Sequence, residues 1–211
     1  MPPFEDFLRA HLPAPPARVL EVGCGSGELT TALAVAGYEV LGIDPLAPQG
    51  ERFRRLKLED LEEEHTWDAV VAARSLHPIR DLDDALDKVV RLLVPGGVLV
   101  VEELGWDLAD DATLDWLWGQ RRAIAAAGGG EAPASLEDLR AEWEAEHVGV
   151  HGYVSLRAEL AERFEEVASE PAPVLHRLLG GVASEVLEQA LVDAGAIRAL
   201  GFRYAGRPRS L

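Results

Sequence analysis

In the first half of the chain, hydrophobic patterns typical of strands alternate with patterns typical of helices. Residues 18–22 form a short apolar run that ends at a glycine, and 28–36 have a helical pattern that also ends at a glycine. Apolar residues resume at 38–43 and end at Asp44. The pattern predicts a strand, a helix and a second parallel strand, joined by a right-handed crossover.

The same alternation continues further along the chain. Residues 52–58 indicate a more polar strand, 68–73 a buried strand, 82–93 an amphipathic helix, and 97–101 a strand after a Pro-Gly-Gly turn. Alternating strands and helices of this kind predict an α/β fold, with a parallel sheet covered on both faces.

The two ends of the chain have different patterns. Residues 4–12 have helical spacing, which indicates a short amphipathic helix. From Trp106 onward the pattern becomes helical and predicts an inserted cap, whose second helix begins with capping-box spacing between Ser135 and Asp138. The remaining expected elements are cap helices at 113–127 and 135–146, a segment at 156–164, a strand near 167, a helix at 183–194 and a strand at 197–204.

Composition narrows the classes of protein. A chain of 211 residues with 48% hydrophobic residues is long enough to bury the core of one domain. Its net charge of −17 disfavours nucleic acid and anionic membrane surfaces as partners. The single Cys24 excludes an internal disulfide, and the sequence shows neither a secretory leader nor a membrane span. We therefore expect a cytoplasmic protein with no membrane partner; the residues indicate no particular oligomeric state.

The loop at residues 23–27 reads Gly-Cys-Gly-Ser-Gly between a strand and a helix, where a bare backbone and free N–H groups can approach a nucleotide-sized ligand. A dinucleotide fingerprint would place its third glycine at Glu28. A carboxylate there repels a pyrophosphate but tolerates a cofactor that carries a sulfonium and an ammonium. Asp44 ends the second strand, from which a carboxylate can bind both ribose hydroxyls, although an acid there could also cap the turn before Pro45.

Residues 19–27, Val-Leu-Glu-Val-Gly-Cys-Gly-Ser-Gly, closely resemble the first motif of class I S-adenosylmethionine-dependent methyltransferases of small molecules. Further segments resemble later motifs of that family, in family order, between about residues 18 and 103. These segments are Gly-Ile-Asp at 42–44, Leu-Glu-Asp-Leu at 58–61, Trp-Asp-Ala-Val-Val at 67–71 and Leu-Leu-Val-Pro-Gly-Gly-Val-Leu at 92–99.

The resemblance implies a Rossmann-like fold: a mostly parallel seven-stranded sheet, helices on both faces and a helical cap insertion. It implies one methyltransferase domain, 1–211. Its expected parts are an N-terminal helix or lid at 1–16, a cofactor-binding core at 17–104, the cap at 105–152 and the rest of the core at 153–211.

The resemblance also implies the ligands. The cofactor would be S-adenosyl-L-methionine, with S-adenosyl-L-homocysteine as product, and the partner a small-molecule acceptor. The glycines would flank the methionine part, Glu21 would orient it, Asp44 would hold the ribose, and Glu59 or Asp60 with the following backbone would lie beside adenine. The implied cofactor-binding residues are Glu21, Gly23, Gly25, Gly27, Asp44, Glu59, Asp60, Leu61 and Arg74.

Methyl transfer from a sulfonium is an in-line displacement. Proximity and orientation supply about 7–11 kcal/mol of such a barrier, and a general base about 3–5 kcal/mol, so a base is helpful but optional. His77 follows the fourth strand, where ligands approach a parallel sheet, and could accept the proton of a hydroxyl or amine acceptor. The competing interpretation is that His77 only packs and hydrogen-bonds within its loop.

The expected acceptor-binding residues are Leu76, Glu102, Trp106 and Trp118. Glu102 and Glu103 alternate along a strand end, so one should point into the cleft and the other into solvent. Our hypothesis is that Phe4, Phe7 and these two tryptophans close a hydrophobic lid.

His147 and His151 are four positions apart, but Gly149 interrupts a helical face and no carboxylate lies between them as in zinc-protease motifs. We therefore expect no metal site. Three other functions stay open: a cofactor-binding regulatory or scaffold protein without transfer, a nicotinamide-dependent oxidoreductase, and a protein methyltransferase.

Overall fold

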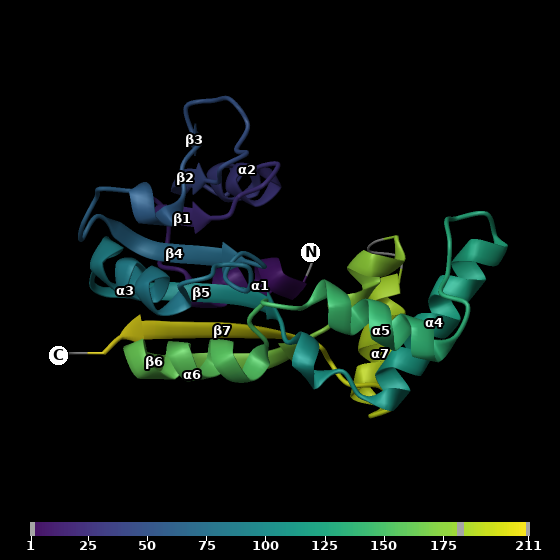
Figure 1. Ribbon diagram of the computed structural model, residues 1–211. Helices are drawn as coiled ribbons and strands as arrows, with labels where there is room; N and C mark the ends of the chain where they lie inside the picture. The colour runs from purple at the N-terminus through teal and green to yellow at the C-terminus, as the bar shows by residue number, and fades with distance from the viewer. Residues whose placement is uncertain (1–2, 181–183, 210–211) are drawn as a thin grey trace. The chain divides into compact units, whose positions relative to one another are not determined.

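The computed structural model describes residues 3–180 and 184–209. Its sheet has seven strands in the order β3-β2-β1-β4-β5-β7-β6 (Figure 1). The strands are β1 Arg18–Val22, β2 Glu39–Ile43, β3 Phe53–Arg54, β4 Trp67–Ala73, β5 Leu93–Leu104, β6 Phe164–Ala172 and β7 Gly201–Pro208. The helices are α1 Pro3–His11, α2 Glu28–Val35, α3 Leu82–Leu92, α4 Asp111–Ala126, α5 Leu136–Glu146, α6 Tyr153–Arg163 and α7 Glu185–Asp193. Short 3-10 turns are η1 Leu58–Asp60, η2 Trp106–Leu108 and η3 Leu175–Leu179.

The first five strands pair in parallel. β1 pairs with both β2 and β4, β2 pairs with β3, and β4 pairs with β5. In the register of β1, Glu21 lies beside Gly42 on one side and Val71 on the other. The mostly parallel, Rossmann-like sheet that we expected is confirmed, and the carboxyl ends of β1, β2 and β4 meet at one edge.

Alternating side chains of the central strands bury both faces of the sheet. Val19 and Val71 pack with α1 and α2 on one face, and α3 and α6 lie on the opposite face (Figure 1). Phe4 and Phe7 of α1 pack in the same hydrophobic core as Val19 and Val71 and are less than 8% exposed. These two rings therefore occupy core positions, not the lid positions that we expected, because amphipathic spacing does not tell which surface a helix covers.

Some expected elements differ from the observed ones. The segment 52–58 contributes only the two-residue β3, since its charged side chains leave little apolar surface to bury. The last strand is β7, not 197–204, because Leu200 is buried in a loop whose apolar residues pack without joining the sheet. The expected helix at 183–194 is α7, and residue 183 lies outside the described part of the chain.

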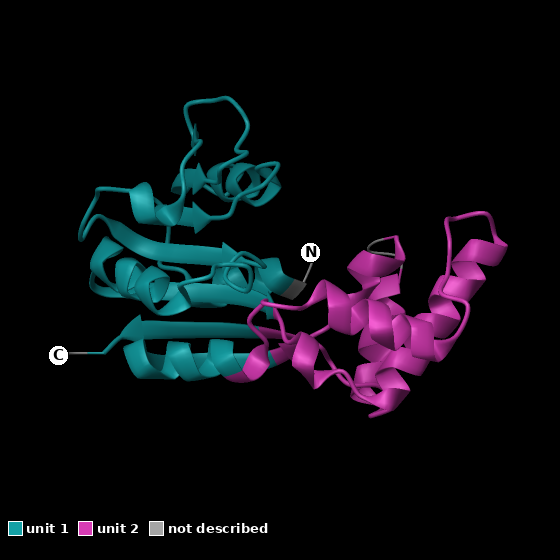
Figure 2. Cartoon of the chain, in the orientation of Figure 1, with its two compact units in different colours: residues 1–103, 155–170, 203–211 teal, residues 104–154, 171–202 magenta. Residues whose placement is uncertain are grey.

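The chain divides into two compact units, coloured separately in Figure 2. Unit 1 comprises residues 1–103, 155–170 and 203–211, and unit 2 comprises 104–154 and 171–202. Unit 2 contains α4, α5 and α7 and has its own core, which includes Leu117, Leu139 and Trp143. The expected cap on its second helix is present, because Ser135 accepts a hydrogen bond from the backbone N–H of Asp138 at 3.1 Å. Throughout the described residues, every helix is too short or too polar to cross a bilayer.

Candidate functional site

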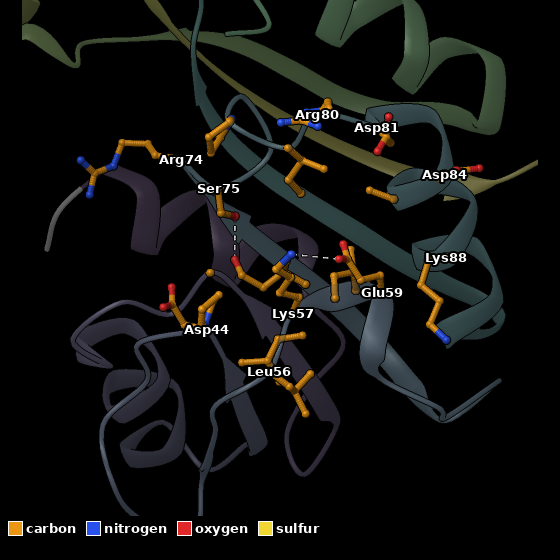
Figure 3. Close-up of a pocket in the computed structure, with 18 of the residues that line it drawn as sticks. Asp44, Leu56, Lys57, Glu59, Arg74, Ser75, Arg80, Asp81, Asp84 and Lys88 are labelled. Carbon is orange, nitrogen blue, oxygen red and sulfur yellow. Dashed lines mark hydrogen bonds and ion pairs between the residues drawn. The ribbon is translucent and has the colours of Figure 1, made fainter. Parts of the chain in front are cut away.

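Unit 1 contains a cavity of about 1060 Å³, which we call the unit 1 pocket (Figure 3). The ends of β1, β2 and β4 form one part of its wall, and residues 56–59 and the start and outer face of α3 form the other. Ligands of parallel α/β sheets bind at this edge, outside the carboxyl ends of the strands. The pocket is therefore the candidate ligand site of unit 1.

The turn after β1 forms the floor of the pocket. The backbone N–H groups of Gly23 and Cys24 donate to the carbonyl oxygen of Ile43, at 2.8 and 3.1 Å. Gly23 has φ +73°, and a Cβ atom there would lie 2.3 Å from Cβ of Ser75. Ser75 in turn donates its hydroxyl to the carbonyl oxygen of Val22 at 2.6 Å. Only glycine fits this position, where the turn meets the loop after β4.

Asp44 organises the mouth of the turn. One carboxylate oxygen accepts from the N–H of Gly25 at 3.2 Å, and the other from the N–H of Leu46 at 2.7 Å. A carboxylate has about four acceptor positions, so Asp44 retains capacity for two further donors, and it lines the pocket. The vicinal hydroxyls of a ribose present such donors. Gly27 ends the turn as the N-cap of α2.

Glu21 lies beneath the turn and is only 3% exposed. Thr30 donates its hydroxyl to Glu21, and Gly42 makes room for the pair, since a Cβ atom there would lie 2.4 Å from the Thr30 hydroxyl. Burial raises the pKa of Glu21 to about 7, although the Thr30 hydrogen bond opposes the shift. Burial likewise raises the pKa of the neighbouring Cys24 thiol to about 11. An acid buried here favours a cationic ligand above it.

The residues expected beside adenine divide between two environments. Glu59 lines the pocket and pairs with Lys57, whose Nζ lies 3.2 Å from the Glu59 carboxylate (Figure 3). Asp60 is exposed and Leu61 is buried, and neither belongs to the described residues that line the pocket. Of these two acids, Glu59 is therefore the one that lines the pocket.

Several pocket residues were not among the expected site residues. Ile79, Arg80, Asp84 and Lys88 line the wall on the side of α3 (Figure 3). For Asp84 and Lys88 the signal is the polar face of the amphipathic pattern at 82–93, which the sequence shows without indicating a ligand. Arg74 was expected, and it lines the pocket with an unusual left-handed backbone at φ 56°.

Two adjacent glutamates lie near the end of β5, and both are buried. Glu102 accepts from Nε of Arg203 at 3.0 Å and is 2% exposed. Glu103 is fully buried; it accepts from the backbone N–H of Leu76 at 2.6 Å and lies 2.6 Å from Nδ1 of His77. The expectation that one of them faces solvent is therefore wrong, because each has a buried donor of its own that replaces water.

The aromatic residues expected at the acceptor lie in unit 2. Trp106 donates its indole N–H to the carbonyl oxygen of Val150 at 3.1 Å and stacks on His147. Trp118 donates to the carbonyl oxygen of Pro133 at 3.0 Å. Both indoles are partly buried against the unit 2 core. Within the described ranges, no group of three or more His, Cys, Asp or Glu side chains has the arrangement of a metal site.

A parallel α/β sheet with a glycine turn after β1, a buried acid beneath the turn and an acid at the end of β2 defines a Rossmann-like protein that binds a nucleoside cofactor. Comparison with known proteins identifies the group within this class. Residues 4–167 match the family model described as a methyltransferase domain, and the chain belongs to that family. The fold is that of class I S-adenosylmethionine-dependent methyltransferases.

Individual relatives agree with this assignment. A ubiquinone biosynthesis O-methyltransferase from Xylella fastidiosa is 35% identical over 120 residues, which is 49% of this chain and 48% of that protein. The chain thus spans about half the length of the curated relatives it matches. The S-adenosylmethionine-dependent methyltransferase structure from Mesorhizobium loti has a TM-score of 0.60 at 18% identity, covering 97% of this chain and 96% of that one. The N-methyltransferase NodS from Bradyrhizobium japonicum, in complex with S-adenosyl-L-homocysteine, has a TM-score of 0.51 at 16% identity, covering 92% and 79%.

Proposed function

We propose that this protein transfers the methyl group of S-adenosyl-L-methionine to a small-molecule acceptor and releases S-adenosyl-L-homocysteine. The observation that carries the proposal is the position of two acids around the glycine turn: Glu21 lies beneath the turn and Asp44 lies at its mouth. The turn leaves a bare backbone, Asp44 retains acceptor positions for a diol, and Glu21 offers a carboxylate to a cation. These features fit an amino-acid-bearing sulfonium nucleoside.

Each group of residues has a role in this proposal. Gly23, Gly25 and Gly27 carry the turn, Glu21 orients the ammonium end, and Asp44 holds the ribose. Glu59 lies beside the adenine, and the following residues, Asp60 and Leu61, support Glu59. Arg74 binds the cofactor at the mouth of the pocket. When bound, the sulfonium supplies an activated methyl group. His77, in the loop after β4, is the proposed base.

Other functions receive less support. A pyrophosphate would meet Glu28 at the start of α2 and the buried Glu21, which disfavours a nicotinamide cofactor. The name of the Xylella relative, an O-methyltransferase of ubiquinone biosynthesis, supports a small acceptor over a protein. A scaffold protein that binds the cofactor without transfer is the second candidate, because a base is optional for this chemistry. The negative net charge of the chain supports a role without nucleic acid. We also propose that the protein acts in the cytoplasm.

Two measurements test the proposal. Calorimetry of the purified chain should show binding of S-adenosyl-L-homocysteine and no binding of NAD or NADP. Methyl-labelled S-adenosylmethionine incubated with the protein and an extract of small metabolites should then yield a labelled product, detected by mass spectrometry. Binding without product would favour the scaffold, and binding of the dinucleotides alone would refute the cofactor assignment.

A further inference from the structure

The carboxylate of Glu103 joins two consecutive residues of the loop after β4. One oxygen accepts from the backbone N–H of Leu76, and the other lies 2.6 Å from Nδ1 of His77. The Glu103 side chain is fully buried, whereas 24% of the His77 side chain remains exposed. The imidazole is therefore held at one nitrogen from inside the protein while part of the ring reaches the surface.

The neighbouring Glu102 shows what a structural carboxylate looks like at this strand end. Its charge is paired with the guanidinium of Arg203, which is itself 5% exposed and also binds Glu170 at 2.9 Å. Glu103 has a different side-chain partner, because its second oxygen lies 2.6 Å from Nδ1 of His77. Glu103 contacts one backbone N–H and one imidazole. The negative charge of this buried carboxylate therefore acts mainly on the imidazole.

A carboxylate only accepts hydrogen bonds, so the nitrogen that faces it must carry a proton. We infer that Glu103 is a positioning residue that fixes neutral His77 as the Nδ1–H tautomer and leaves Nε2 as a proton acceptor. The inference rests on the proposed function and deepens it, because it names the chemistry of the acceptor: a group that loses a proton on methylation, such as a phenolic or other hydroxyl.

The proton balance follows from this tautomer. The acceptor O–H bond breaks as its proton moves to Nε2, and an oxygen lone pair forms the new O–C bond. The electron pair of the former C–S bond stays on the sulfur of the departing nucleoside. His77 becomes an imidazolium, whose charge Glu103 stabilises through the hydrogen bond to Nδ1.

Nitrogen NMR of histidine tests the tautomer directly. In ¹⁵N-histidine-labelled protein at alkaline pH, the His77 signal should show a protonated Nδ1 and a bare Nε2; its assignment comes from the signal lost in His77→Gln. In Glu103→Gln the amide oxygen should keep the Leu76 N–H, which turns the NH₂ group toward Nδ1. That nitrogen must then accept, so the proton should move to Nε2. A wild-type His77 protonated on Nε2 would overturn the inference, whatever happens to the fold of the variant.

Transfer of labelled methyl into the metabolite extract provides the functional readout, together with calorimetry of S-adenosyl-L-homocysteine. Both His77→Gln and Glu103→Gln should bind that product as wild type does, yet transfer about 100-fold more slowly. His65→Asn is the matched control, since His65 lies at the opposite end of β4 and asparagine tolerates its left-handed backbone; it should transfer at the wild-type rate. Undiminished transfer by Glu103→Gln overturns the positioning role, whereas absent transfer by wild type with intact binding contradicts the proposed function instead.

Discussion

Replacing Glu21 by glutamine should stabilise the ligand-free protein at alkaline pH and leave its stability almost unchanged at acidic pH. The carboxyl group is buried beneath the glycine turn, where burial raises its pKa from 4.5 to about 7. Glutamine has the size of a protonated glutamic acid and keeps an oxygen that can accept from Thr30. The variant therefore imitates the form that the folded protein prefers.

The sign and size of the effect follow from proton linkage. Because the folded pKa is the higher one, the folded protein binds the proton more tightly, and this stabilisation is complete below pH 4.5. It is lost as pH rises between the two pKa values and is absent above about pH 8. A separation of 2.5 pKa units corresponds to about 3 kcal/mol of unfolding free energy.

Urea denaturation across pH 5 to 8.5, without cofactor, measures the difference between variant and wild type. We expect the unfolding free energy of Glu21→Gln to exceed that of wild type by an amount that grows with pH and reaches about 3 kcal/mol at the alkaline end. Glu64→Gln is the control, since Glu64 is an exposed acid outside the pocket and its replacement should have little effect at any pH.

A difference between Glu21→Gln and wild type that does not change with pH would refute the reasoning. It would mean that the variant acts through packing and that Glu21 is ionised in the folded protein throughout. Calorimetry gives the complementary result: the same variant should bind S-adenosylmethionine more weakly, because it lacks the carboxylate that we propose orients the ammonium.

Three further outcomes are expected. Asp44→Asn should weaken binding of S-adenosyl-L-homocysteine by about 10- to 100-fold in calorimetry, as expected for loss of a charged hydrogen-bond acceptor; unchanged affinity would remove Asp44 from the site. Gly23→Ala should lower the free energy of unfolding in urea by about 1–3 kcal/mol, because its backbone has φ +73° and its Cβ would meet Ser75; a neutral result would contradict that close approach. Ser135→Ala should cost about 1 kcal/mol by the same assay through loss of the helix cap, while Ser26→Ala, at an exposed position, should cost much less.

Much of unit 1 could be predicted from sequence because its signals are local. The apolar runs of β1 and β4 require burial on both faces, and the glycine turn needs backbone that only glycine provides at Gly23. The expected end of β2 was enough to predict that Asp44 lies at the ligand site, without information on distant contacts, and Asp44 does line the pocket. Local pattern is sufficient where one strand and the turn after it define the geometry.

The rest depends on contacts between distant residues. Glu103 meets His77 across a separation of 26 positions, and Glu102 meets Arg203 across 101, so alternation along β5 could not tell which acid meets which partner. Phe7 has the same amphipathic spacing whether it covers a sheet or closes a lid. The pocket wall on α3 is a charged helix face, which sequence alone cannot distinguish from an ordinary solvated surface.

The path of the chain through unit 2 limits how this protein can be re-engineered. Unit 2 is assembled from residues 104–154 and 171–202, and Leu139 from the first segment shares a core with Val174 and Leu200 from the second. Grafting one segment alone from a homologue would pair foreign and native halves of a single core. A chimera intended to exchange unit 2 should therefore splice at four junctions and transplant both segments together.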